Sequence, residues 1–323
     1  MLKEAMYLHM NEIDFFKNFN LGKEIDLAGS FAYNALSILN MEDNVYQNDQ
    51  IFLFLYNTAV SVERLQKCVL FIYGNYDETS ITDFAASLKS HDHQMLQSRI
   101  TEITHKKLSA EQNSLLMLLS GFYLNGRYAN YSFGDKFDCK SQLEEFVKKN
   151  YDASMVEPNF LGNDTIITES AKERIGRTLG KLLSYYYDII KEKSRALNLY
   201  TYELRSGSSA EKVFLNTFPK KSVQAISQTE RNALAELIVY LINTTDNTGY
   251  LNYLREIKPL SFDPYLVQEY LAEILKRQTP QDLVDEVETI YEDFSHEEIK
   301  ERKQSLLIMN ERNVFFPEDD EDE

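Results

Sequence analysis

The sequence predicts an all-α protein, and three observations support this fold class. Apolar residues recur at helical spacings of three, four or seven along two segments, 51–72 and 175–189. Helix start signals are frequent, because a Ser followed three residues later by Glu or Gln can form a capping box. No Asn-Gly or Asp-Gly hairpin signal separates two alternating runs. The stripes are Ile51, Leu55, Val62, Leu65, Val69 and Ile72, and Ile175, Leu179, Leu182, Tyr186 and Ile189.

Six helices are expected in the first half of the chain, which contains no proline to break a helix interior. The third of them follows the first apolar stripe. Ser109 and Ser141 carry the capping signals that start the last two. The predicted helices are 4–18, 23–40, 48–74, 79–105, 109–127 and 140–150.

Seven helices are expected in the second half. The first follows the second apolar stripe, and Ser227 and Ser295 supply capping signals for two others. Pro264 and Pro280 each follow a capping residue, and at the first helical position the missing N–H of proline costs nothing. The predicted helices are 165–206, 209–216, 227–244, 248–257, 263–276, 280–293 and 295–308.

Length and proline distribution predict two helical domains. A chain of 323 residues exceeds the roughly 150 residues of one typical domain. All six prolines lie after residue 157, which places a boundary near 150–164. We expect a helical bundle over 1–150, a second all-helical domain over 151–316 and an acidic tail over 317–323.

Charge is distributed unevenly along the chain. The net charge of -17 produces a field that repels phosphate, which opposes nonspecific binding to nucleic acid or anionic lipid. The stretch 171–221 nevertheless holds eleven Lys or Arg against five Asp or Glu, whereas 281–323 sums to -12. Six consecutive carboxylates at 318–323 repel one another, so we expect a solvated, disordered tail. A nucleic acid would have to bind a local basic patch.

Cysteine usage and hydropathy favour a cytoplasmic protein without a membrane partner. Cys68 and Cys139 belong to no CxxC or Cys/His cluster, so neither a disulfide framework nor a zinc site is indicated. The most apolar run, 51–73, carries charged residues such as Glu63 near its middle, which would be costly in a membrane span. Phosphate-loop, dinucleotide-binding, zinc-protease and nucleophile-elbow motifs are absent from the sequence, so no cofactor is predicted.

The histidines offer two kinds of site. His91-Asp92-His93 contains transition-metal ligands, but positions two apart diverge by about 200° on a helix and the spacing implies no third ligand. A solvated polar turn is therefore preferred to a metal site. Arg99 and His105 pair a permanent cation with a group that titrates near neutrality. In RNA cleavage, His105 would transfer the proton and Arg99 would stabilise charge on phosphorus, without a metal.

Three segments resemble HEPN domains. The segment 58–70, which includes Glu63, Arg64 and Lys67, looks like their Ala-x-Glu-(Lys/Arg)-x-x-Lys helix. Segment 90–96, Ser-His-Asp-His-Gln-Met-Leu, resembles their (Thr/Ser)-His-Asp-Leu step, and segment 122–128, Phe-Tyr-Leu-Asn-Gly-Arg-Tyr, their closing Tyr-x-x-x-Arg-Tyr. The resemblance covers about residues 45–135 and implies a HEPN-like bundle of four or five helices.

The resemblance also implies a function. HEPN domains occur in prokaryotic antiviral defence and toxin–antitoxin systems, where many are dimeric, metal-independent ribonucleases with paired Arg-x4-6-His motifs and others bind nucleotides or partner proteins. Here Arg127 occupies the motif position, but Ser132, Phe133 and Gly134 stand where the His is expected. The resemblance is therefore to the non-catalytic branch, unless Arg99 and His105 have taken over. The nucleotide- or phosphate-binding residues would be His91, His93, Arg127 and Tyr128.

A basic stripe offers a second anion-binding surface. Five cations recur near helical spacing within 171–221, and such a stripe can bind a polyanion or serve as the solvated face of an amphipathic helix. The acidic tail could fold over it and mimic phosphate; deletion of Glu318 to Glu323 would then increase RNA binding. The stripe is Arg174, Arg177, Lys181, Lys191 and Arg195.

The sequence thus predicts a HEPN-like protein that recognises nucleotide or RNA, and ribonuclease activity by Arg99 and His105 across a homodimer interface stays open. The competing hypothesis is a non-enzymatic, acidic interaction protein whose second domain and tail bind a basic protein partner.

Overall fold

The computed structural model is all-α, as predicted. It describes residues 12–39, 48–131, 133, 137–158, 165–199, 204–205, 207–215, 223–276 and 278–309. Thirteen α-helices and one two-stranded antiparallel sheet occur within these residues. The predicted acidic tail 317–323 and the start of the predicted helix 4–18 lie outside the described residues.

The chain forms two compact units, Met1–Gln228 and Thr229–Glu323. The boundary expected near 150–164 lies inside unit 1, because helix α8 (Glu169–Ala196) packs against α3 (Asn48–Tyr73) in the same core. Helix α10 (Val223–Asn243) contains the division between the units. The structure therefore assigns the basic stretch to the first unit.

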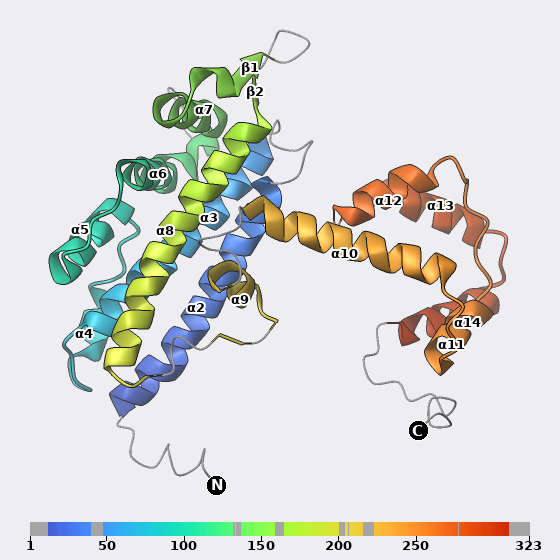
Figure 1. The fold of residues 1–323 in the computed structure, drawn as a ribbon, viewed down its shortest axis with the longest axis horizontal. Coiled ribbons are helices and arrows are strands. Elements are labelled where there is room, and N and C mark those ends of the chain that lie inside the picture. Colours follow the sequence, from blue (N-terminus) through green and yellow to red (C-terminus); the bar gives the residue numbers. More distant parts are fainter. Residues whose placement is uncertain are drawn as a thin grey trace. The chain divides into compact units, whose positions relative to one another are not determined.

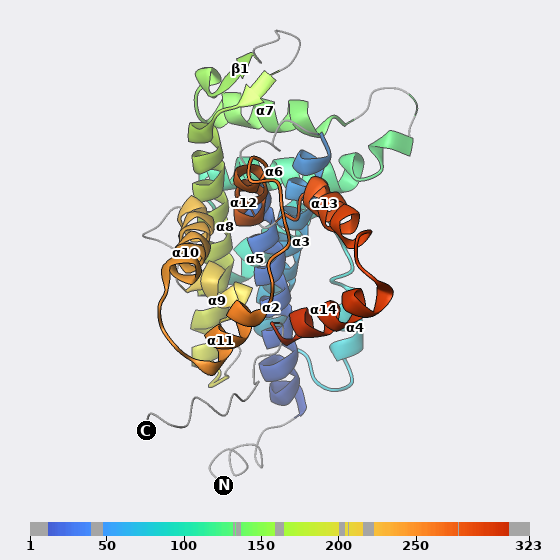
Figure 2. The ribbon, with the colours of Figure 1, turned by 90° about the vertical axis from the view of Figure 1, so that its right-hand side faces the viewer.

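Unit 1 is a bundle around α3. The axes of α2 (Glu12–Leu39), α3 and α8 lie roughly along the bundle, with α2 running opposite to α3 and α8 (Figures 1 and 2), and their apolar stripes face one another. Around them lie α4 (Ile81–Ala86), α5 (His93–Thr104), α6 (Ala110–Gly121), α7 (Cys139–Asn150) and α9 (Ser209–Phe214). Burying these stripes drives the fold, since each fully buried Leu or Ile contributes roughly 1.5–3 kcal/mol.

Helix α9 approaches α2 closely because Gly29 lacks a side chain. A Cβ at Gly29 would lie 2.3 Å from the Cα of Ala210, a contact that no real side chain makes. The small residue thus allows the two backbones to touch and closes this side of the core.

Several elements differ from the prediction for local reasons. The predicted helix 79–105 is two helices, because Asp92 accepts from the backbone N–H groups of Gln94 and Met95 and starts α5 there. The predicted helix 165–206 ends at Ala196, where Asn198 takes the left-handed conformation with φ 55°. The short sheet of β1 (Val156–Pro158) and β2 (Thr165–Ile167) is not predicted, because neither strand is long enough to show alternation.

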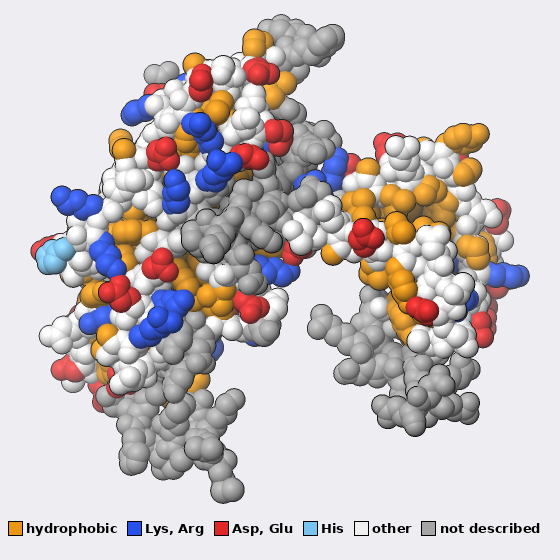
Figure 3. Space-filling view, viewed as in Figure 1, with side chains coloured by type: hydrophobic (Ala, Val, Ile, Leu, Met, Phe, Trp, Pro, Cys, Tyr) orange, Lys and Arg blue, Asp and Glu red, His pale blue; other side chains and the backbone are white. Residues whose placement is uncertain are grey.

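The described residues of unit 2 form four further helices with little interior. They are α11 (Gly249–Glu256), α12 (Val267–Leu275), α13 (Gln281–Tyr291) and α14 (His296–Ile308). Among its described residues only Gly249 and Tyr270 are buried. Hydrophobic side chains instead gather on the visible face of unit 2 (Figure 3).

Candidate functional site

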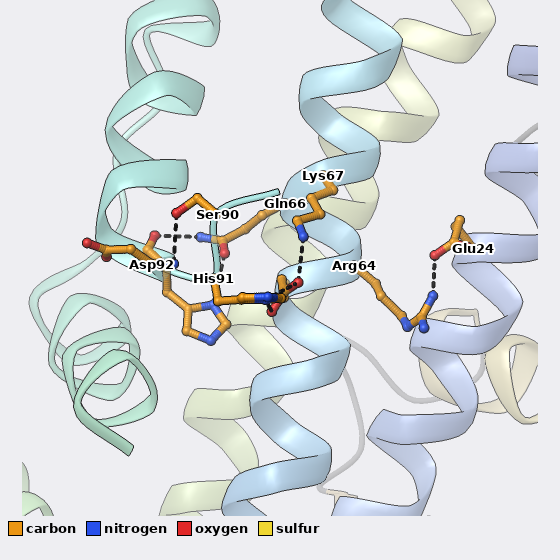
Figure 4. A network of polar contacts seen from close by, with 9 residues as sticks. Glu24, Arg64, Gln66, Lys67, Ser90, His91 and Asp92 are labelled. Carbon is orange, nitrogen blue, oxygen red and sulfur yellow. Dashed lines mark hydrogen bonds and ion pairs between the residues drawn. The ribbon is translucent and has the colours of Figure 1, made fainter. Parts of the chain in front are cut away.

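Helix α3 carries a cluster of polar residues at the middle of its otherwise apolar sequence. Arg64 points toward α2, where it pairs with Glu24, while Gln66 points toward the chain that precedes α5 (Figure 4). Glu63 and Gln66 are polar, yet both are buried because the helix lies at the centre of the bundle. Buried polar groups require partners, so these residues determine where α3 meets its neighbours.

Glu63 is the acceptor at the centre of this cluster. Its carboxylate receives a hydrogen bond from Lys67 Nζ at 2.6 Å, and both its oxygens lie 3.1 Å from Nδ1 of His91. Burial raises the pKa of Glu63, but the hydrogen bonds from Lys67 and His91 outweigh it, and the pKa is lowered overall. The ionised carboxylate therefore accepts a hydrogen bond from Nδ1–H of His91 and leaves Nε2 for a ligand, with half of the side chain (51%) exposed.

Tyr123 and Arg127 extend the cluster beyond His91. The His91 and Tyr123 rings are stacked with centroids 5.2 Å apart, and the Arg127 guanidinium lies 4.4 Å from the Tyr123 ring and 4.8 Å from the Tyr128 ring. We call this set the His91 cluster. It comprises Glu63, Lys67, His91, Tyr123, Arg127 and Tyr128.

A π-helix positions Tyr123 and Arg127. The five residues Phe122–Gly126 leave the α-helical hydrogen-bond pattern directly after α6, a feature that is often found at functional sites. Gly126 permits this turn to pack, since a Cβ there would lie 2.5 Å from the Phe137 ring. The local irregularity thus brings the Arg127 guanidinium against the Tyr123 and Tyr128 rings.

Asp92 holds His91 in place. Besides capping α5, its Oδ1 accepts a hydrogen bond from Ser120 of α6 at 3.2 Å. The segment Ser90-His91-Asp92 is thereby tied to two helices, which gives the half-exposed imidazole a defined position.

His93 lies inside the bundle. Its Nδ1 is 3.0 Å from Oε1 of Gln66, whose Nε2 donates to the His93 carbonyl and to the Tyr186 hydroxyl. Nδ1 therefore carries the proton, and the buried Nε2 has no hydrogen-bond partner among the described residues. Burial lowers the pKa of His93 to about 4, so the ring is neutral. Of the two predicted histidines, only His91 is exposed enough to meet a ligand.

Arg99 and His105 are not brought together within one chain. Arg99 donates to the Ser87 carbonyl at 2.9 Å, and His105 ends α5 in the left-handed conformation with φ 56°. Six positions on a helix separate two residues by about 9 Å along the axis and about 120° around it. The proposed catalytic pair would need a second chain to complete a cleft.

The predicted basic stripe lies on the outer side of α8. Arg174, Arg177, Lys181 and Arg195 are exposed, and Lys191 is half-buried. Arg177 is paired with Glu173 at 2.9 Å and Arg174 lies over the Tyr151 ring, whereas the opposite side of the helix is core. The geometry is that of an amphipathic helix with a mixed-charge solvent face.

Sequence reasoning did not single out Glu63, Lys67 and Tyr123 as site residues. The available signal was a Glu and a Lys four positions apart within an apolar helix, where unpaired charges are costly. Lys67 also borders a cavity of about 390 Å³ between α2 and α3, which Phe16, Arg64 and Cys68 line as well. Burial raises the pKa of the Cys68 thiol, so it stays protonated and unreactive.

The described part of the chain contains no group of three His, Cys, Asp or Glu side chains arranged to hold a metal ion. None of its helices combines the length and apolar character that a membrane span requires. No family model, curated protein or solved structure matches the chain.

Proposed function

We propose that the protein recognises the phosphate and base of a nucleotide or RNA at the His91 cluster. One observation carries the proposal: the segments 58–70, 90–96 and 122–128 converge, since Glu63 bonds His91, which stacks on Tyr123 beside Arg127. These are the segments that resemble HEPN domains, so the geometry and the resemblance favour the same residues.

Each residue has a physical role in this proposal. The Arg127 guanidinium offers paired N–H donors that suit phosphate oxygens, and Nε2 of His91 adds a further hydrogen bond. Tyr128, which is 63% exposed, offers a flat ring on which a base can stack. Lys67 and Glu63 largely neutralise each other, so Arg127 supplies the net positive charge that the acidic chain otherwise lacks.

Recognition is favoured over cleavage because Arg99 and His105 are separated within one chain. The resemblance would place the protein in a cytoplasmic prokaryotic defence or toxin–antitoxin system. The test below can also reveal ribonuclease activity. In that case His91 could transfer the proton in place of His105, because Glu63 orients its ring.

The test compares binding of a fluorescent, 5′-phosphorylated RNA by the full chain and by variants. Arg127→Ala and His91→Gln should each weaken binding, Arg127→Ala by about tenfold or more, which corresponds to a charge-assisted hydrogen bond of roughly 1.5–3 kcal/mol. Arg177→Ala is the matched control, because it removes an exposed arginine from the basic stripe. Equal losses for Arg127→Ala and Arg177→Ala would refute a specific site.

A parallel incubation of the RNA with chelator separates recognition from catalysis. Intact RNA with wild-type protein supports recognition alone. Cleavage that His91→Ala abolishes would assign the imidazole to this cluster, and cleavage that His105→Ala abolishes would assign it to the Arg99–His105 pair.

Unit 2 favours a second function, binding of a basic protein partner. Its described residues are almost without buried apolar side chains, and Ile242 and Tyr265 are 74% and 91% exposed. Acidic residues outnumber basic ones by 16 to 8 between residues 229 and 309. A cationic amphipathic model helix should therefore bind the full chain in a salt-dependent manner, while its anionic counterpart should not.

A further inference from the structure

A groove of about 300 Å³ lies within unit 2, where the end of α10, α11, the segment after α11 and α14 meet. Leu241, Leu254 and Leu306 supply apolar lining. Arg255, Lys258 and Arg302 line the same groove. The groove thus combines an apolar surface with three cations, in a unit whose charge is otherwise mainly negative.

The two arginines are held in place by neutral groups. Arg255 donates to the carbonyls of Thr244 and Asp246, at 3.2 and 2.8 Å, and Arg302 donates to the Lys258 carbonyl at 2.8 Å. Arg302 Nε is buried without a hydrogen-bond partner in the described part of the chain.

Within the described residues, none of the three cations forms an ion pair with a carboxylate. Lys276 and Lys300 of the same unit are paired, with Glu273 and Glu297 respectively. No carboxylate of the described residues pairs with the three cations at the groove, which favours an occupant that joins apolar side chains to carboxylates.

The chain itself contains such a segment. Met309 lines the groove, and five positions later the sequence continues as Val314-Phe315-Phe316-Pro317, followed by six consecutive carboxylates. Five residues can span up to about 17 Å, enough to return to a groove that the preceding residue borders. Two adjacent phenylalanines match the apolar lining, and the carboxylates match Arg255, Lys258 and Arg302.

We propose that residues 314–323 bind this groove of the same chain, with Phe315 and Phe316 against its apolar lining and the carboxylates beside its cations. Attachment a few residues away gives the segment an effective concentration of the order of millimolar, so weak contacts suffice to fill the groove. A basic partner helix is disfavoured at this position, because it would meet three cations. The groove would thus be a site for acidic, aromatic peptides, with the chain's own segment as the resident occupant.

The test uses the full chain and a labelled peptide with the sequence of residues 310–323. The wild-type chain should bind the added peptide poorly, because its own segment competes. A chain with Phe315→Ser and Phe316→Ser should bind the peptide about tenfold more tightly or better, at peptide concentrations up to about 1 mM. Equal binding by the two chains, or no binding by either, would overturn the proposal.

Charge variants in the Phe315→Ser, Phe316→Ser chain identify the groove as the binding site. Lys258→Glu should reduce peptide binding about tenfold, because it reverses an exposed charge that lines the groove. Lys300→Glu is the control: it makes the same charge change on α14 at a position that does not line the groove. Equal effects of the two variants would show nonspecific attraction and refute the assignment.

Hydrogen exchange gives a second, independent measurement. Amides of α11 and α14 should exchange faster in the Phe315→Ser, Phe316→Ser chain than in the wild type, with the difference unchanged on dilution. A difference that disappears on dilution would mean that the segment binds a second copy, and no difference would mean that the groove is empty in the wild type; either result contradicts binding within one chain.

Discussion

Units 1 and 2 are both helical, but they differ in where their apolar side chains lie. In unit 1, α2, α3 and α8 bury continuous stripes such as Ile175, Leu179 and Leu182. In unit 2, α13 and α14 have amphipathic or mixed sequences but no buried residue, and their neighbours are joined by individual polar contacts. Glu286 accepts hydrogen bonds from the Asp263 backbone N–H and from the Tyr270 hydroxyl, and the Tyr253 hydroxyl donates to the Ser305 carbonyl.

Unit 1 is therefore held together by a buried apolar core, whereas unit 2 depends more on individual polar contacts. A shared core makes unit 1 rigid enough to hold the His91 cluster in one geometry, which recognition of a small group requires. Unit 2 keeps its apolar groups available, which suits binding of a peptide or protein better than chemistry on a small molecule. Four predictions test this contrast, from the largest expected effect to the smallest.

Core truncation should distinguish the units most strongly. Leu182→Ala should lower the free energy of unfolding of unit 1 by about 3–4 kcal/mol, because it leaves a cavity beside fully buried neighbours. Leu283→Ala, at a half-buried position of α13, should lower the free energy of unfolding of unit 2 by about 1 kcal/mol or less. Hydrogen exchange of α8 and α13 peptides reads the two effects separately, and similar values would remove the contrast between the units.

Acidification should destabilise unit 1 through His93. Its pKa is about 4 in the fold and about 6.5 in an unfolded chain, so the unfolded state binds the extra proton between these values. The contribution of His93 is complete above pH 6.5 and is lost as the pH falls toward 4, a change of about 3 kcal/mol.

His93→Gln should flatten this pH dependence, whatever its effect on stability at neutral pH. His296→Gln, at an exposed position of α14, is the control and should leave the profile unchanged. The measurement is urea unfolding followed between pH 4 and 7; an unaltered slope in His93→Gln would show that other groups control it.

Replacing a glutamate by glutamine in each unit removes one negative charge and allows the two units to be compared. Glu63→Gln should cost about 2 kcal/mol, because Lys67 and His91 lose the buried carboxylate that accepts their hydrogen bonds. Glu286→Gln should cost about 1 kcal/mol or less and loosen only α12 and α13, since its partners are neutral donors. Thermal unfolding and local exchange measure both, and a larger loss for Glu286→Gln would reverse the expected order.

The smallest effects concern two helices that start with the same capping motif. Ser109 and Ser295 each form a capping box, with Gln112 and Glu298, and replacement by Ala should cost about 1 kcal/mol in either unit. In unit 1 the core should hold α6 in place, whereas in unit 2 the first turn of α14 should fray. Exchange rates of the first helical amides distinguish these results; equal fraying at both helices would mean that tertiary packing does not stabilise α6.

The sequence predicted most helices because apolar stripes and capping residues are local signals. Helices α7 and α14 begin within one residue of the predicted starts, at Cys139 and His296. The break before Asp92 was missed, because it depends on a cap that competes with continued helix, and the π-helix after α6 has no periodic signal. The association of α8 with the first core was missed because proline distribution does not report which stripes face each other.

The candidate site was predicted only in part. The His91 ring stacks on Tyr123, and Arg127 lies over the Tyr123 and Tyr128 rings, whereas His93 lies inside the bundle with its Nδ1 3.0 Å from Oε1 of Gln66. The role of Glu63 follows from contacts 28 residues apart, which spacing cannot show. Arg99 illustrates the opposite case, since a plausible interval in sequence leads to a bond with Ser87 rather than to a shared cleft.

Photocrosslinking to a 5′-phosphorylated RNA that carries 4-thiouridine would test the central claim most directly. We predict that mass spectrometry will find the crosslink at Tyr128 or Tyr123, and that Arg127→Ala will abolish it while the fold persists. Crosslinks confined to the α8 stripe between Arg174 and Arg195, and unaffected by Arg127→Ala, would contradict recognition at the His91 cluster.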